Sequence, residues 1–188
     1  LDIIPKINTI KIGLLIDSIS QDLWVHNIIK NLISQNFISV DLIVLNDSLP
    51  LKNTNKNVSN RFSKIKSELN QHYLFFQYIK WDQDYFNEKE NAFQKKDISK
   101  LVNNIETIKV NPRKTKFYDF IEGEDIKFIN EKKLDVIIRF GFRILQGEIF
   151  KSAKYGIWSY HHDDNRYFRG GPGLFWELYE NKCESGTI

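Results

Sequence analysis

Cysteine and methionine are almost absent from this sequence. The chain of 188 residues has one Cys and no Met. A single thiol, Cys183, excludes an internal disulfide framework and is typical of a reducing compartment, so we expect a cytoplasmic protein. Methionine is missing at position 1 as elsewhere, and the final residues, ESGTI, read as the start of a strand. Both features predict a fragment that is truncated near its C-terminal end.

Long hydrophobic runs and clustered charge are also missing. No apolar run approaches the roughly 18 residues of a membrane-spanning helix, and no secretory signal is visible, so we expect no membrane partner. The net charge is +3 and the basic residues are scattered, which does not indicate a nucleic-acid-binding surface. Hydrophobic residues make up 41% and charged residues 27% of the chain. This composition and length predict one globular domain over residues 1–188.

Buried apolar runs alternate with helical patterns along the chain. IKIGLLID (10–17) and VDLIVLND (40–47) read as strands, and between them Trp24, Ile28, Ile29 and Leu32 repeat at helical spacing. A strand, a helix and a strand in this order predict a parallel sheet. Ser18 and Ser20 are candidate caps of that helix.

The second half of the chain continues the same pattern. Further strands are predicted at IETIKV (105–110), LDVIIRFGF (134–142) and GIWSYHH (156–162). A helix is predicted over residues 118–133, with a weak point at Gly123, and a short helix over 144–155. The expected fold is therefore α/β, with a mainly parallel twisted sheet and helices on both of its faces.

Ligands of open α/β sheets bind outside the carboxyl ends of the strands. Three such ends carry polar residues here: 17–18, 140–143 and 159–164. No GxGxxG motif follows the first strand, because Gly13 lies inside it, so a dinucleotide-binding fold is not indicated.

The third strand end runs into HHDDNRYFRGG (161–171), which can be read in three ways. His and Asp suit a divalent metal, but adjacent strand residues point to opposite faces, and no HExxH or second acidic cluster completes a ligand shell. The Asp-Asp-Asn run also suits a plain turn, with a second turn at residues 169–172. A functional loop at a strand end is the third interpretation, and it is compatible with the turns.

The sequence from residue 134 to 188 resembles the catalytic domain of the folate-dependent formyltransferases. The family pattern reads roughly YGxILP, a helix, GxxNxHxSLLPxxRG, a helix and ETGVT. Gly156, His161, Arg169, Gly170 and the run 184–186 fall in its register. The order of strands and helices back to Ile10 is similar to that of the family, which implies a Rossmann-like formyltransferase domain.

The resemblance implies a function. Such an enzyme transfers a formyl group from 10-formyltetrahydrofolate to an amine, here of a small metabolite or an amino sugar, because the chain shows neither the extra domain nor the basic charge that a tRNA acceptor would need. Two alternatives stay open. One is a formyltransferase-like domain that binds a folate or sugar without catalysis, and the other is a metal-dependent hydrolase that uses His161, His162 and Asp163. The sequence identifies neither the acceptor nor the oligomeric state.

The resemblance also implies roles for individual residues. His161 is the polar catalyst, Ser159 stands where the family has its catalytic Asn, and Asp163 is a further candidate for acid–base work. The family's catalytic Asp would lie beyond Ile188. The proposed folate slot consists of Phe140, Gly141, Phe142, Ile144 and Leu145. Arg169 and Gly170 would contact the acceptor, and no metal ligand is assigned.

The sequence also gives expectations for an arginine and two tryptophans of this region. Arg143 either meets an acidic group of a ligand or partner or is a solvated surface arginine, and the second is favoured. Trp158 and Trp176 are expected in the core.

Overall fold

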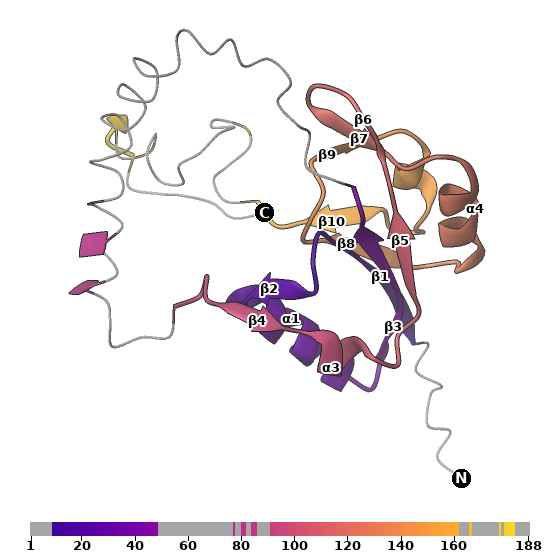
Figure 1. The fold of residues 1–188 in the computed structure, drawn as a ribbon, viewed down its shortest axis with the longest axis horizontal. Helices are drawn as coiled ribbons and strands as arrows, with labels where there is room; N and C mark the ends of the chain where they lie inside the picture. The colour runs from indigo at the N-terminus through magenta and orange to yellow at the C-terminus, as the bar shows by residue number, and fades with distance from the viewer. Residues whose placement is uncertain are drawn as a thin grey trace, which may run out of the picture.

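The computed structural model describes residues 9–48, 77, 80–81, 84–85, 91–161, 166, 177 and 179–182. A five-stranded parallel sheet forms its centre (Figure 1). Its strands lie in the order β10 (Ile157–Ser159), β8 (Val136–Arg139), β1 (Ile10–Ile16), β3 (Ile38–Asn46) and β5 (Thr107–Val110). The prediction of an α/β fold with a parallel sheet is confirmed, and the strand order is Rossmann-like.

The sheet order contains a reversal. The chain builds β1, β3 and β5 in one direction, then returns to the other side of β1 to add β8 and β10. In open parallel sheets the crevice at such a reversal, outside the carboxyl ends of the strands, is the usual ligand site. Here that crevice lies at the ends of β1 and β8.

Successive residues of β1 belong to two different hydrophobic clusters, because neighbouring side chains of a strand point to opposite faces. Leu14 packs in the cluster that includes Val25 and Ile29 of helix α1 (Leu23–Ser34). Leu15 packs in the cluster that includes Ile129 of helix α4 (Gly123–Glu131). The apolar β1 run thus forms the central strand between two cores.

Helix α1 lies where its apolar spacing predicts it, but the predicted caps are wrong. Its N-cap residue is Asp22, which makes no side-chain capping bond. Ser18 instead accepts the Ser20 backbone N–H at 3.0 Å, because β2 (Ser20–Asp22) intervenes before the helix and pairs with β4 (Lys95–Asp97). Near this pair, α1 lies beside the short helix α3 (Ser99–Val102) (Figure 1).

A second, three-stranded sheet replaces parts of two predicted helices. It consists of β6 (Arg113–Lys114), β7 (Tyr118–Phe120) and β9 (Ile144–Gln146). The helix predicted over 118–133 therefore begins only at Gly123, since β7 pairs with β9 in register. The segment 144–155 contains β9 and a 3₁₀ helix, η2 (Glu148–Lys151), instead of an α-helix.

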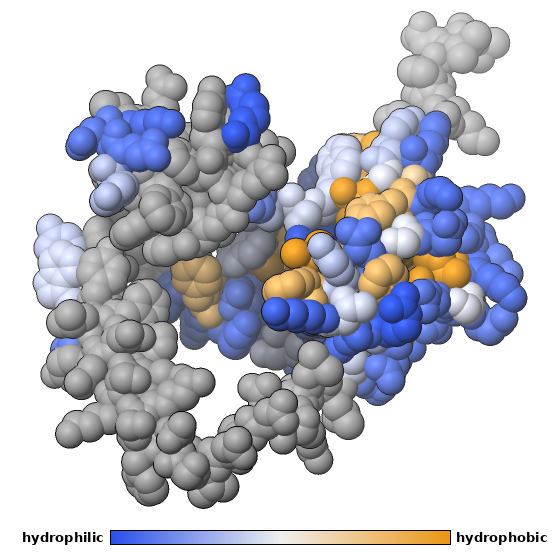
Figure 2. Space-filling view, turned by 90° about the horizontal axis from the view of Figure 1, so that it is seen from above, coloured by the Kyte–Doolittle hydropathy of each residue, from blue (hydrophilic) through white to orange (hydrophobic). Residues whose placement is uncertain are grey.

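Hydrophilic side chains cover most of the described surface on the face seen in Figure 2, and exposed hydrophobic residues lie between them in small groups. Among the described residues, no helix has the length and apolar character needed to cross a membrane.

Candidate functional site

The carboxyl ends of three strands meet at one pocket of about 270 Å³. These ends are the three polar strand ends that the sequence singled out, after β1, β8 and β10, and they coincide with the reversal in strand order. This volume is slightly below the roughly 300–1,000 Å³ of pockets that enclose a drug-sized ligand. The pocket therefore accommodates the reacting ends of larger molecules, or one small group. It is lined by Asp17, Trp24, Arg139, Phe140, Gly141, Phe142, Ser159 and Tyr160.

A tight contact joins the loop after β8 to the end of β1. A Cβ atom added to Gly141 would lie 2.8 Å from the Asp17 Cγ atom and closer still to the Asp17 backbone nitrogen. Only glycine fits such an approach of two backbones. The next residue, Phe142, has a φ of 65°, which is uncommon for a residue with a side chain, and its ring is buried.

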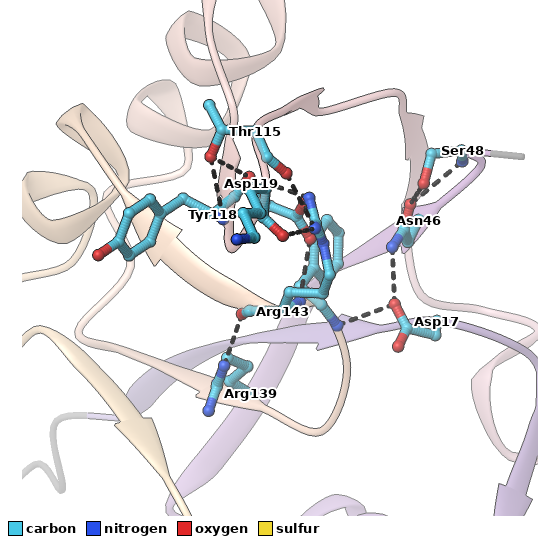
Figure 3. Close-up of polar contacts among 10 residues, drawn as sticks. Asp17, Asn46, Ser48, Thr115, Tyr118, Asp119, Arg139 and Arg143 are labelled. Atoms are coloured by element: carbon cyan, nitrogen blue, oxygen red, sulfur yellow. Dashed lines mark hydrogen bonds and ion pairs between the residues drawn. The ribbon is translucent and has the colours of Figure 1, made fainter. Parts of the chain in front are cut away.

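Asp17 holds this loop in place with its Oδ1 atom. Oδ1 accepts the Phe142 backbone N–H at 2.8 Å and a side-chain N–H of Asn46 at 2.7 Å (Figure 3). Asn46 ends β3, and its Oδ1 in turn accepts the Ser48 backbone N–H at 3.1 Å. The Asp17 carboxylate therefore links the ends of three elements, and no described residue donates a hydrogen bond to its other oxygen, Oδ2.

Arg139 and Ser159 form a pair on neighbouring strands. The Ser159 Oγ atom accepts two N–H groups of Arg139, from Nε at 3.1 Å and from Nη2 at 2.8 Å. A third N–H, on Nη1, donates to the Arg143 carbonyl oxygen at 2.7 Å (Figure 3). Arg139 and Ser159 are direct partners in the register of β8 and β10, which places the guanidinium and hydroxyl together.

The guanidinium of Arg139 is half-buried, and that burial has an electrostatic cost. Burial lowers the pKa of Arg139 from its ordinary value, and the negative charge of Asp17 partly offsets this effect. Within the described part of the chain no carboxylate forms an ion pair with Arg139. The pocket thus contains a positive group whose charge is only partly compensated.

Aromatic rings form one wall of the pocket. The Trp24 ring, from α1, contacts Phe140 edge-on at a centroid distance of 5.9 Å and Tyr160 at 5.8 Å. Aromatic pairs at these separations are favourable beyond the area they bury. The wall offers an apolar surface beside the polar Asp17, Arg139 and Ser159.

Arg143 has a structural role that neither of its two interpretations predicted. Its Nε and Nη2 atoms donate to Oδ1 of Asp119 at 2.9 and 2.6 Å, and its backbone N–H donates to Oδ2 at 2.9 Å. The same guanidinium donates to the carbonyl oxygens of Thr115, Lys116 and Tyr118. The Arg143 side chain, 35% exposed, thus pairs with an acidic group of the protein itself and fastens the β6–β7 hairpin to the pocket loop (Figure 3).

Only some residues of the expected folate slot lie at the pocket. Phe140, Gly141 and Phe142 line the pocket, whereas Ile144 and Leu145 do not. Ile144 is exposed, and Leu145 packs in the core with Phe142. The reason is the pairing of β9 with β7, which carries the chain away from the pocket directly after Arg143.

The expected catalytic residues lie partly within the described structure. Ser159 lines the pocket, and His161, half-buried, follows it by two residues beyond the end of β10. Asp163, Arg169 and Gly170 lie outside the described residues, as do His162 and Trp176. Trp158, expected in the core, is 59% exposed, because its strand lies at the edge of the sheet. In the described ranges, no group of three or more His, Cys, Asp or Glu side chains is arranged to hold a metal ion.

Four pocket residues, Asp17, Trp24, Arg139 and Tyr160, were not among the predicted site residues. Asp17 and Tyr160 lie in polar strand ends that the sequence indicates, whereas Arg139 lies within a strand and Trp24 follows the apolar spacing of a helix. Arg139 also gives a signal of its own, since a charged residue inside the apolar run LDVIIRFGF needs a partner. The sequence matches no protein-family model, and it has no significant match among curated proteins.

Proposed function

We propose that this pocket transfers a formyl group from 10-formyltetrahydrofolate to an amine of a small metabolite or an amino sugar. The observation that carries the proposal is the Ser159 hydroxyl, which lines the pocket at the strand reversal and is held by Arg139. The chain would then be a formyltransferase-like domain with helices on both faces of its sheet. The two hydrophobic clusters, one containing residues of α1 and the other a residue of α4, support that arrangement.

The reaction needs a hydrogen-bond donor beside the formyl oxygen. The folate supplies the formyl carbon: the amine nitrogen forms a bond to it, the bond to the folate nitrogen breaks, and a proton moves from the amine to that nitrogen. Negative charge develops on the formyl oxygen as the amine attacks. A donor fixed near that oxygen is worth about 10²–10³ in rate.

Ser159 meets this requirement through the direction of its hydrogen. The two N–H groups of Arg139 occupy the acceptor side of the Ser159 oxygen, so the hydroxyl hydrogen points away from the guanidinium. The adjacent positive charge also polarises the O–H bond and makes it a stronger donor. A serine held in this way replaces the amide donor that the formyltransferase pattern has at this position.

The aromatic wall supports the donor half of the proposal. Trp24, Phe140 and Tyr160 provide an apolar surface against which a flat, fused ring such as a pterin can pack. His161, just beyond the wall residue Tyr160, is the residue that the formyltransferase resemblance makes the polar catalyst. Asp163, Arg169 and Gly170 keep the roles in acid–base chemistry and acceptor binding that the resemblance implies.

A titration with 5-formyltetrahydrofolate, a stable analogue of the donor, tests the proposal. Trp24 lines the pocket, so saturable binding should change the intrinsic tryptophan fluorescence. The Trp24→Phe variant should lose most of this change while calorimetry still detects binding. Trp158→Phe is the matched control, because Trp158 is not among the residues lining the pocket, and it should keep the full response.

Three results would decide against the proposal. Failure to bind at about millimolar analogue, a binding free energy weaker than roughly −4 kcal/mol, would exclude folate from this pocket. Binding whose fluorescence change disappears in Trp158→Phe and persists in Trp24→Phe would place the folate elsewhere. Binding of the analogue together with no formyl transfer from 10-formyltetrahydrofolate to hydroxylamine, used as a small amine acceptor, would identify a folate-binding domain without catalysis.

A further inference from the structure

The donors of Arg139 are only partly used within the protein. A guanidinium has five N–H groups, and three of those in Arg139 donate to Ser159 and to the Arg143 carbonyl. One N–H on each terminal nitrogen is left over among the contacts of the described residues. Two N–H groups on the terminal nitrogens of a guanidinium are the arrangement that binds both oxygens of a carboxylate or phosphate.

The electrostatics of the pocket favour such an anion. Arg139 is half-buried and has no ion pair with any described carboxylate, so its charge has lost hydration without gaining a direct counter-ion. An anionic group of a ligand in the pocket would supply that counter-ion. The Arg143 carbonyl and Ser159 fix the orientation of the guanidinium in advance, which lowers the entropic cost of binding.

Asp17 sets a second condition on the ligand. Its carboxylate lines the same pocket and is close enough for its charge to act on Arg139. A purely anionic ligand would be repelled by Asp17. The Asp17 Oδ1 atom is already occupied by Phe142 and Asn46, whereas its Oδ2 atom accepts no hydrogen bond from any described residue. An N–H group of the ligand near Oδ2 would turn the repulsion into attraction.

We infer that the pocket recognises a small molecule that carries an acidic group and an amine, with the carboxylate or phosphate on Arg139 and the amine beside Asp17. Amino acids and aminoalkyl phosphates belong to this class. The inference rests on the proposed function in one respect, since the amine would be the formyl acceptor. The recognition itself requires no folate, so it can be tested without the donor.

Four small molecules serve as probes that test the contribution of the amine and distinguish a phosphate from a carboxylate. O-Phosphoethanolamine is compared with ethyl phosphate, and β-alanine with propionate, so each pair keeps the acid and differs in the amine. Binding is followed by ¹H–¹⁵N NMR at the Arg139 Nε–H group and the Phe142 backbone amide. We expect the amine-bearing member of one pair to bind about 2–5-fold more tightly than its partner, because a partly exposed charge pair contributes on that scale. The pair that binds identifies the anion as phosphate or carboxylate.

Two variants test whether Arg139 binds the acidic group of the probe and Asp17 its amine. Asp17→Asn keeps an oxygen for the Phe142 amide and removes the charge, so it should abolish the preference for the amine and tighten binding of the simple acid. Arg139→Gln should weaken all four probes by about tenfold or more, since it removes charge-assisted hydrogen bonds. Arg113→Gln is the matched control, because Arg113 lies on β6, outside the pocket lining, and it should change nothing.

The outcomes distinguish this inference from the proposed function. The inference is overturned if no probe, at concentrations up to about 50 mM, shifts the Arg139 and Phe142 signals of the unmodified protein, since this is well above the range of a weak specific ligand. It is equally overturned if the simple acids bind as well as the amine-bearing ones. If the protein binds folate but none of the amine-bearing acids, only this inference is refuted. If it binds an amine-bearing acid but no folate, only the formyl-transfer proposal is refuted.

Discussion

Replacing Arg143 by methionine should be among the most destabilising single changes in this protein. The Asp119 side chain is 1% exposed and accepts three N–H groups, all of them from Arg143. Methionine keeps much of the side-chain volume and the backbone N–H, but it removes both guanidinium contacts. A carboxylate would then be buried without its counter-charge.

The expected cost follows from that burial. Breaking a buried ion pair by removing one partner typically costs about 3–5 kcal/mol, because the remaining charge has neither water nor a partner. Domains are usually stable by about 5–15 kcal/mol, so this loss would remove a large part of the total. The three hairpin carbonyls that Arg143 also contacts add less, since these bonds are at exposed positions where water can replace the donor.

Urea unfolding of four proteins measures this cost. The unmodified protein, Arg143→Met, Asp119→Leu and the double variant form a cycle from which the coupling energy is obtained. The double variant should be clearly more stable than Arg143→Met alone, because an apolar pair leaves no buried charge. Arg113→Met is the matched control: Arg113 also pairs with a carboxylate on two hydrogen bonds, at Glu122, but both side chains are 54% exposed. It should have little effect.

A small effect would refute the reasoning. If Arg143→Met lost less than about 1 kcal/mol, the scale of an exposed pair, the Asp119 carboxylate would have to reach water in the folded protein. If the double variant lost as much as the two single variants together, Arg143 and Asp119 would act independently, and the geometry described here would not explain their stability.

Three further changes have defined outcomes. Gly141→Ala should lose about 1–3 kcal/mol in thermal unfolding, because its new methyl group would press on Asp17, and wild-type stability would contradict this contact. Leu145→Ala should lose about 2–5 kcal/mol, as expected for a core residue. Arg113 lowers the pKa of Glu122 through its hydrogen bonds, so in an NMR titration Arg113→Gln should return that pKa toward 4.5. The stabilisation from this depressed pKa is present above the unfolded value of Glu122 and is lost as the pH falls through the folded value.

The strands of the central sheet could be predicted from the sequence, and the small sheet could not. IKIGLLID reads as a buried strand because both of its faces are apolar, and β1 lies there. The sequence of β7 includes Asp119, which would not be placed in a core on local pattern alone. Its burial depends on Arg143, 24 residues further on. The same distant pairing converts part of a predicted helix into strand.

The candidate site, too, could be predicted only in part from the sequence. The polar ends of β1, β8 and β10 were predictable, because parallel strands bring their carboxyl ends to one edge. The contacts that shape the pocket were not, since Asp17 and the Phe142 amide are 125 residues apart. Trp24 gives no signal of its own, because an aromatic residue at helical spacing reads as core. Only the folded sheet shows that it lies beside Phe140 and Tyr160.

A chain of contacts connects the buried Asp119 to the pocket. Asp119 binds the Arg143 side chain, the Arg143 carbonyl accepts an N–H of Arg139, and Arg139 donates to Ser159. The hydroxyl proposed to stabilise the transferred group is therefore oriented by a hairpin that does not itself line the pocket. A variant that only weakens the core can therefore be distinguished from one that also disturbs the pocket. Leu145→Ala weakens the core and leaves the chain of contacts in place, so ligand affinity should hold as long as the protein is folded.

Arg143→Met removes the side-chain contacts of the second member of this chain and leaves only its backbone contacts. At temperatures and urea concentrations where both variants stay folded, it should weaken binding of the NMR probes, while Leu145→Ala should not. The comparison removes overall stability as an explanation, because the two changes have similar expected costs. Equal affinity in the two variants would show that Arg139 and Ser159 keep their orientation without the hairpin. The pocket would then depend only on the strand ends of the central sheet.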